Sequence, residues 1–232
     1  MPRRTRASAS RLDSSPEHDV PRRDRSPVRV TWRPWAVVTG ASSGIGRALA
    51  AEAAARGCNV VLVARREAEL SALGEQLERQ YGVETRAVAL CLARPESAEE
   101  LHTATAALSG VEFFVANAGR SWFGPLVDQP LDVSEQMLAL NVATVTRLCR
   151  LYASDFARQG RGAVLVTSSI VSLAPLPHAA LYGASRAFVR SLAHALREEC
   201  APAGVVVASL MPGATATEFA QVGGIERVSV LH

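Results

Sequence analysis

A serine, a tyrosine and an arginine occur at a spacing that supports proton transfer. Ser169 lies thirteen residues before Tyr182, and Arg186 follows the tyrosine by four residues. On a helix, positions i and i+4 lie on one face, so the phenol and the guanidinium would be neighbours. A hydroxyl, a phenol and a fixed cation at one spot can hold a substrate oxygen and pass a proton to it. We therefore interpret these three residues as candidate catalytic groups.

A glycine-rich turn joins an apolar run to a segment with helical periodicity. Its residues are Thr39-Gly40-Ala41-Ser42-Ser43-Gly44-Ile45-Gly46. Gly40 permits a tight turn, Gly44 lets backbone N–H groups approach a pyrophosphate, and Gly46 allows close packing of helix on strand. With a strand before it and a helix after it, the turn predicts a dinucleotide site that also includes Ser42, Ser43 and Ile45.

The second apolar run ends in two arginines, Arg65 and Arg66. A site selective for NAD would place an acid here to bind the adenosine ribose, whereas Arg65 can stack on adenine and pair with a 2′-phosphate. The sequence therefore favours NADP(H) as cofactor, with Arg65 as the contact. The alternative is that both arginines only begin a solvated helix.

Six apolar runs alternate with helical segments along the chain. The runs cover 35–39, 59–63, 86–90, 111–115, 163–167 and 205–210. Helices are expected over 45–56, 67–80, 132–158 and 179–200, with a further one opened by Pro95. Strands without polar alternation, separated by helices, predict a parallel sheet covered on both faces. The expected fold class is α/β, a Rossmann-like doubly wound sheet that binds ligands at the carboxyl ends of its strands.

Charge is distributed unevenly. All 25 basic residues are arginines, so mechanisms that need a lysine amine are excluded. Residues 1–33 carry nine arginines and four acids, a net charge of +5, and are expected to form a disordered basic tail. Residues 34–232 carry 16 arginines and 18 acids, a net charge of −2, and are expected to form one catalytic domain without a nucleic-acid surface.

The remaining composition predicts a cytoplasmic protein. The four cysteines are widely spaced and show no metal-binding pattern, so we expect reduced thiols and no metal site. The chain contains no uninterrupted apolar run of about 18 residues, so we expect no membrane span.

Taken together, these residues resemble the short-chain dehydrogenase/reductase family, and in particular its NADPH-preferring members that act on ketones or alcohols. The motifs occur in the family's order. They are the glycine turn, Asn117-Ala118-Gly119, Asn141, Ser169, Tyr182 with position 186, and Pro212-Gly213 with Thr217.

The resemblance implies roles for these positions. Tyr182 would be the general acid in reduction and the base in oxidation, and Ser169 would bind the substrate oxygen. Asn141 would hold a water in a proton relay, unless it only kinks its helix. Residues 117–119 would line the adenosine ribose, Arg186 would contact the nicotinamide ribose, and Pro212, Gly213, Thr215 and Thr217 would contact the nicotinamide. The family also implies a small apolar carbonyl or alcohol substrate and a homodimer or homotetramer.

The chain departs from the family pattern at four places. Arg186 stands where the family has lysine, and Cys91 stands where an acid is usual. Arg120-Ser121 interrupts a stretch that is glycine-rich in the family. Finally, only 13 residues follow Phe219. Arginine keeps the positive charge but cannot release its proton, so we expect reduced turnover. Two alternatives stay open. One is a catalytically impaired sensor or scaffold that binds NADP(H), and the other is a truncated chain with an open substrate pocket.

Overall fold

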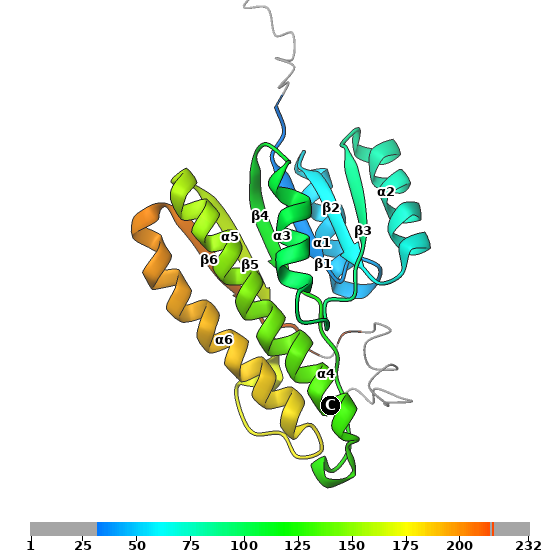
Figure 1. The fold of residues 1–232 in the computed structure, drawn as a ribbon, viewed down its shortest axis with the longest axis vertical. Helices are drawn as coiled ribbons and strands as arrows, with labels where there is room; N and C mark the ends of the chain where they lie inside the picture. Colours follow the sequence, from blue (N-terminus) through cyan, green and yellow to red (C-terminus); the bar gives the residue numbers. More distant parts are fainter. Residues whose placement is uncertain (1–31, 214, 216–232) are drawn as a thin grey trace, which may run out of the picture. The chain divides into compact units, whose positions relative to one another are not determined.

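A single sheet of six parallel strands organises the computed structural model, which describes residues 32–213 and residue 215 (Figure 1). The strands are β1 Trp35–Thr39, β2 Asn59–Ala64, β3 Thr85–Ala89, β4 Val111–Ala116, β5 Gly162–Thr167 and β6 Val205–Leu210. Their order is β3-β2-β1-β4-β5-β6. The chain therefore winds outward from β1 and reverses direction between β1 and β4, which confirms the predicted doubly wound α/β fold.

Helices connect the strands and cover the sheet. The longer helices are α1 Gly44–Ala55, α2 Glu67–Tyr81, α3 Ser97–Ala106, α4 Leu131–Leu138, α5 Val145–Gln159 and α6 Ala180–Cys200. The short ones are η1 Leu126–Asp128, η2 Ala139–Thr144, η3 Ile170–Ser172 and η4 Ala201–Ala203. The predicted strand and helix positions agree with these bounds to within one or two residues, apart from the segment that follows β4.

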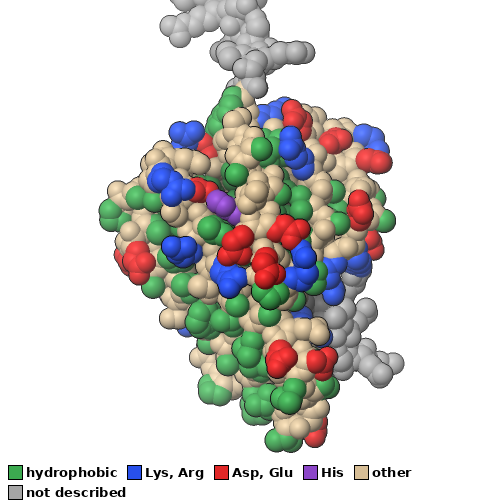
Figure 2. All heavy atoms as spheres, viewed as in Figure 1, with side chains coloured by type: hydrophobic (Ala, Val, Ile, Leu, Met, Phe, Trp, Pro, Cys, Tyr) green, Lys and Arg blue, Asp and Glu red, His purple; other side chains and the backbone are tan. Residues whose placement is uncertain are grey.

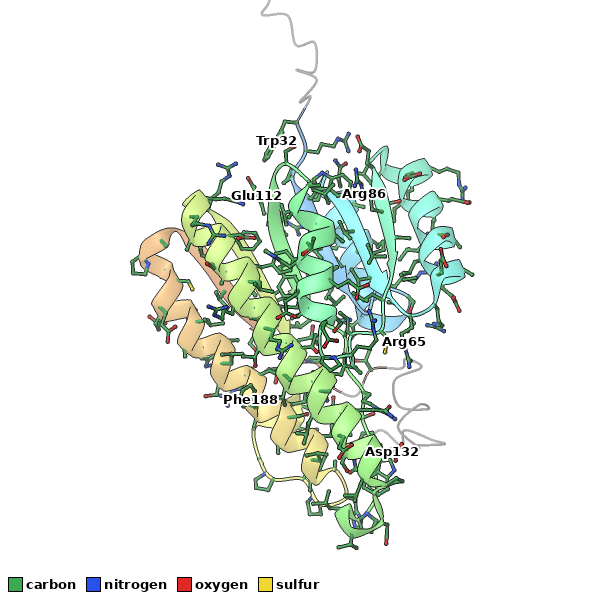
Figure 3. The ribbon with its side chains drawn as sticks, viewed as in Figure 1. Trp32, Arg65, Arg86, Glu112, Asp132 and Phe188 are labelled. Atoms are coloured by element: carbon green, nitrogen blue, oxygen red, sulfur yellow. The ribbon has the colours of Figure 1, made fainter. Side chains whose placement is uncertain are left out.

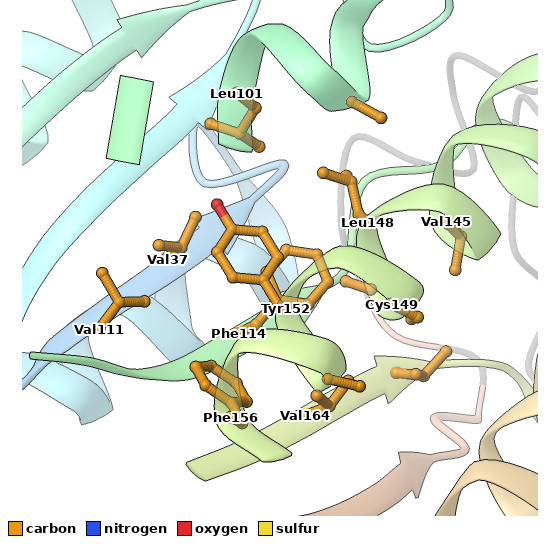
Figure 4. Packing of buried hydrophobic residues seen from close by; sticks show 14 of the residues in the cluster. Val37, Leu101, Val111, Phe114, Val145, Leu148, Cys149, Tyr152, Phe156 and Val164 are labelled. Atoms are coloured by element: carbon orange, nitrogen blue, oxygen red, sulfur yellow. The ribbon is translucent and has the colours of Figure 1, made fainter. Parts of the chain in front are cut away.

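Two hydrophobic cores lie on opposite faces of the sheet, because successive strand side chains point to opposite sides. Val38 packs with Leu62 and residues of α1 and α2, whereas the adjacent Val37 packs with residues of α3, α5 and α6. Figure 4 shows the second core, in which the Tyr152 ring stacks on Phe114 with centroids 4.3 Å apart. Such dense packing fixes the strand ends from which the candidate site is built.

Burial also perturbs groups inside this core. It raises the pKa of the Cys149 thiol to about 12 and raises that of the Tyr152 phenol as well. The Tyr152 hydroxyl has a partner in Thr105 Oγ1 at 2.8 Å. Both side chains therefore stay protonated at neutral pH and act as packing residues.

The helix expected over 132–158 is interrupted. Its middle turn, η2, is a π-helix, so the run consists of α4, η2 and α5. Asn141 lies within η2 and is completely buried. Wider π turns often occur at functional sites because they turn side chains away from the regular helical direction.

The described chain begins at Trp32, so the predicted tail lies outside it except for Trp32 and Arg33. Trp32 sits against Gly110, where an added Cβ would lie 2.7 Å from its ring. Among the helices that the structure describes, none combines the length and the apolar character needed to cross a membrane.

Candidate active site

The glycine turn is held by backbone contacts at the end of β1. Gly40 has a φ of +69°, a conformation that glycine adopts without strain, and its N–H donates to Val63 O at 2.7 Å. A Cβ at position 46 would lie only 2.1 Å from Gly40 O. The start of α1 thus approaches the turn as closely as two backbones can.

The amino end of α1 is suited to an anion. Its N-cap, Ser43, has extended backbone angles and makes no side-chain capping bond, and its first turn carries no acid. The N–H groups there, with the positive end of the helix dipole, favour a negatively charged group such as a pyrophosphate. Ser42, Gly44 and Ile45 are half-buried beside them.

The two arginines after β2 take different directions. Arg65 is exposed (Figure 3), whereas the guanidinium of Arg66 turns back to the glycine turn, with Nη2 3.2 Å from Ser42 Oγ. Arg66 also lies 3.6 Å from Glu69. The sequence pointed to Arg65 as the phosphate contact, whereas the structure brings Arg66 to the glycine turn.

Asn117 and Ala118 are tied to the end of β1 through Thr39. The Thr39 hydroxyl accepts hydrogen bonds from the N–H groups of Asn117 and Ala118 at 2.9 and 3.1 Å, and it donates to Val115 O. Asn117 Nδ2 donates to Thr39 O at 3.0 Å. The loop after β4 is therefore fixed beside the glycine turn, at the point where the strand order reverses.

Asn141 connects this loop to α6. Its Oδ1 accepts from Arg120 N at 3.0 Å, and its Nδ2 donates to Arg120 O and to Ser185 Oγ at 2.9 and 3.1 Å. These bonds use the side-chain amide to position protein groups. They support a positioning role for Asn141 beside the water-holding role that the family resemblance implies.

Ser169 and Tyr182 lie at the carboxyl end of β5 and the start of α6. Both are nearly buried, with 8% and 7% of their surface exposed. Ser169 Oγ accepts from Val171 N at 3.4 Å, and the ring of Phe123 lies 5.9 Å from the ring of Tyr182. Both side chains thus belong to the predicted strand edge, with aromatic carbon packed against the phenol.

Arg186 lies beneath the tyrosine. Its Cζ is 5.2 Å from the centroid of the Tyr182 ring, and only 3% of the residue is exposed. Nη1 donates to Thr167 O at 3.1 Å, and a Cβ at Gly119 would lie 2.0 Å from Nη2. The buried Nε has no hydrogen-bond partner among the described residues. The guanidinium thus spans the ends of β4 and β5, and its Nε–H remains without an acceptor among the described residues.

The segment after β6 closes this edge. Pro212 O accepts from Ile170 N at 3.1 Å, so the segment lies beside η3, which follows Ser169. Gly213 lies next to Ile170, and Thr215 Oγ1 donates to Gly213 O at 3.1 Å. Thr217 lies outside the described residues.

Two hollows lie away from this edge. One, of about 60 Å³, lies between α3 and α5, and a groove of about 370 Å³ lies between α5 and α6. Neither is lined by Ser169, Tyr182 or Arg186, so we assign neither to the reaction.

Within the described ranges, no group of three His, Cys, Asp or Glu side chains is placed to hold a metal ion.

The supporting roles of three residues were not predicted from the sequence, although Thr39 itself belongs to the predicted glycine turn. Thr39 holds the loop after β4, Ser168 Oγ donates to Arg186 O at 2.8 Å, and Ser185 binds Asn141. Ser168 and Ser185 each adjoin a predicted site residue in the sequence, which was the one available signal. Their bonds to backbone and amide groups depend on the folded chain.

Comparisons with known proteins agree with this geometry. A model of the short chain dehydrogenase family matches residues 34–224. A short-chain dehydrogenase from Sphingobium yanoikuyae, solved in complex with NADPH, superposes with a TM-score of 0.82 at 34% identity, covering 86% of this chain and 78% of that one.

Two curated relatives are similar over most of the chain. A 7beta-hydroxysteroid dehydrogenase of Collinsella aerofaciens is 35% identical over 190 residues, 82% of this chain and 72% of the relative. The very-long-chain 3-oxoacyl-CoA reductase of Homo sapiens is 33% identical over 192 residues, 81% of this chain but 61% of the relative. The predicted oxidoreductase class is confirmed, and the chain belongs to the short-chain dehydrogenase family.

Proposed function

We propose that this protein transfers a hydride between NADP(H) and a carbonyl or secondary alcohol substrate, with Tyr182 as general acid and base. The observation that carries the proposal is the buried Arg186 guanidinium, 5.2 Å from the Tyr182 ring centroid and at the same strand edge as the glycine turn. A fixed cation beside the phenol can stabilise the negative charge that develops on the Tyr182 oxygen as its proton is transferred.

Three features support a fit to a dinucleotide. The close approach of Gly46 to Gly40 forms a cradle that a side chain would fill, and the end of α1 offers N–H groups with no acid nearby. The Nε of Arg186 is a buried donor without a partner in the described chain, as a site for ribose hydroxyls would provide. We assign the pyrophosphate to Ser42–Gly46, the adenosine to Arg65, Arg66 and residues 117–119, and the nicotinamide ribose to Tyr182 and Arg186.

Bound NADPH would supply the hydride, and the chain's own residues would handle the proton. In reduction, Tyr182 Oη donates its proton to the substrate oxygen, while the Ser169 hydroxyl hydrogen-bonds the same oxygen as negative charge develops. Arg186 stabilises the phenolate that remains. Because arginine keeps its proton, reprotonation of Tyr182 proceeds without it, and we expect slow turnover.

The experiment is NADPH oxidation with a panel of ketones, together with NADPH binding followed by fluorescence. We expect consumption that falls by about 10²- to 10⁴-fold in Tyr182→Phe while binding persists, since only the transferable proton is removed. Tyr81→Phe, at the end of α2, is the matched control and should leave the rate unchanged. NADPH binding without consumption in the wild type, or full activity in Tyr182→Phe, would refute the proposal.

We also propose a cytoplasmic homodimer or homotetramer. All four cysteines carry free thiols, in keeping with a reducing compartment. The groove between α5 and α6 is lined largely by apolar side chains such as Ala153, Ala157, Leu192 and Leu196, and Phe188 of α6 is 44% exposed. These features support pairing through the two helices. Light scattering after size exclusion would test it, and a monomeric mass would contradict it.

A further inference from the structure

Six apolar side chains are exposed on two segments that lead to the Ser169–Tyr182 site. They come from η1 and the start of α4, and from η3 and the segment before α6. They are Leu126, Val127, Leu131, Ile170, Leu173 and Leu176, which we call the apolar rim. Val127 and Leu131 are 91% and 80% exposed, too much for packing residues. Figure 2 shows hydrophobic side chains at the lower end of the molecule, where α4 lies. Clustered exposed apolar groups commonly mark a binding surface.

The rim is continuous with the reacting groups. Ile170 directly follows Ser169, and Leu173 caps the same short helix. On the other side, Phe123 packs against the Tyr182 ring, and Gly124 N donates to His178 O at 2.7 Å, which joins the loop after β4 to the segment before α6. A substrate whose oxygen reaches Tyr182 would therefore lay the rest of its surface on the rim.

The charged residues in the two described segments that carry the rim are mainly acidic. Residues 121–138 contain Asp128, Asp132 and Glu135 and no basic residue, and residues 168–181 contain no charged residue apart from the titratable His178. Asp132 lies at the lower end of α4 in Figure 3. Arg120 precedes the first segment, and its guanidinium donates to the neutral Gln136 Oε1 of α4.

We propose that this site selects an uncharged, bulky, apolar ketone or the corresponding alcohol, and rejects ketones that carry a carboxylate or phosphate. The inference rests on the proposed function and specifies its substrate class, and it departs from the small substrate that the family resemblance implied. An apolar substituent that covers the rim stabilises the complex in proportion to the apolar area removed from water. An anionic substituent would lose hydration there and be repelled by the three carboxylates of residues 121–138.

The test compares ketones that differ in size or in charge. Benzophenone and 4-benzoylbenzoate share one skeleton, and 2-butanone represents a small ketone. We measure kcat/KM from NADPH oxidation, and Kd for the protein loaded with NADP⁺, which cannot reduce the ketone, by calorimetry. We expect benzophenone to be preferred over 4-benzoylbenzoate by about tenfold or more, and over 2-butanone by a similar factor.

A second experiment introduces a charge into the apolar rim. Leu173→Arg should reduce or reverse the preference for benzophenone over its carboxylate, by about tenfold, because the guanidinium can pair with the carboxylate. The matched control is Val206→Arg on the edge strand β6, a residue that is 64% exposed and near the opposite end of the strands. It should leave the preference unchanged. Leu173 is 58% exposed, so the substitution should preserve folding, which a thermal melt checks.

The outcomes separate the two proposals. Turnover with equal or greater preference for the carboxylate would overturn the inference and leave the proposed function standing. No turnover with any ketone, beside intact NADPH binding, would overturn both. If Leu173→Arg changes the oligomeric mass but not the ketone preference, the rim belongs to an interface with a second copy and the inference fails.

Discussion

Two glycines beside the proposed cofactor cleft would meet almost the same obstacle if they carried a Cβ. An added Cβ would lie 2.1 Å from a neighbouring atom at Gly46 and 2.0 Å at Gly119. At Gly46 that atom is the backbone oxygen of Gly40, whereas at Gly119 it is Nη2 of Arg186. We call the surroundings of Gly46, where the clash is with backbone, the backbone end of the cleft, and those of Gly119, where it is with the Arg186 side chain, the side-chain end.

The two clashes differ in whether a second substitution can relieve them. A backbone clash cannot be relieved by changing a neighbouring side chain. A clash with a guanidinium can be, because a shorter or slimmer side chain at position 186 makes room. The two ends of the cleft should therefore respond differently to one chemical change, glycine to alanine.

The largest effect is expected at the backbone end. Gly46→Ala forces the end of α1 away from the glycine turn, at a cost of about 1–3 kcal/mol in the free energy of unfolding. NADPH affinity should fall by about a hundredfold, since the N–H groups lose their positions. Urea unfolding and NADPH titration measure both quantities.

Gly183→Ala is the control for Gly46→Ala. Its Cβ would come no closer than 3.6 Å to Val171 O, and alanine suits the helix better. Unfolding and binding should therefore be unchanged or slightly improved. Normal NADPH affinity in Gly46→Ala would show that the turn is looser than the structure indicates.

The next effect lies at the side-chain end. Gly119→Ala should lower kcat/KM by about tenfold to a hundredfold, because the methyl group displaces the guanidinium that spans β4 and β5. The same change made in an Arg186→Lys background should cost much less. Kinetics of the four proteins in this double-mutant cycle measure the coupling. Equal losses in both backgrounds would contradict the pairing of Gly119 with Arg186.

These pairings mark the limit of sequence reasoning for this chain. The strands were predictable because runs such as 60–63 are apolar at every position, as buried parallel strands require. The glycine turn was predictable because each of its three glycines has a geometric role, in the tight turn, in the approach to a pyrophosphate or in the packing of helix on strand. The contact of Arg186 with Thr167 O was not, because every residue has a carbonyl and only the fold selects one.

The interruption at Asn141 was not predictable for a related reason. A π turn changes the hydrogen-bond partner from i+4 to i+5 without a distinctive composition, so the sequence reads as one continuous helix. Arg65 and Arg66 are likewise equivalent in composition. The path of the chain as it leaves β2 decides which guanidinium reaches Ser42.

The third effect tests the arginines at the adenosine end. Arg66→Ala should raise the KM for NADPH by about tenfold, because it removes a charged partner of the 2′-phosphate, and should leave the KM for NADH almost unchanged. Arg65→Ala should act in the same direction but less strongly, since that side chain is exposed. Arg79→Ala, a surface arginine later in α2, is the control. Equal KM changes for NADPH and NADH in Arg66→Ala would show that Arg66 does not recognise the 2′-phosphate.

The smallest effect is expected from Arg186→Lys alone. Lysine keeps the positive charge beside Tyr182, so stabilisation of the phenolate should change little, and NADPH binding should be retained. What lysine adds is a proton that it can give up, which opens a route for reprotonating the phenol. We therefore expect kcat to rise by about fivefold, a modest gain within the range of proton-transfer effects. Pre-steady-state kinetics can locate the gain in the step that follows hydride transfer. An unchanged or lower kcat would show that the guanidinium does not limit turnover, and that the nicotinamide end is adapted to arginine as it stands.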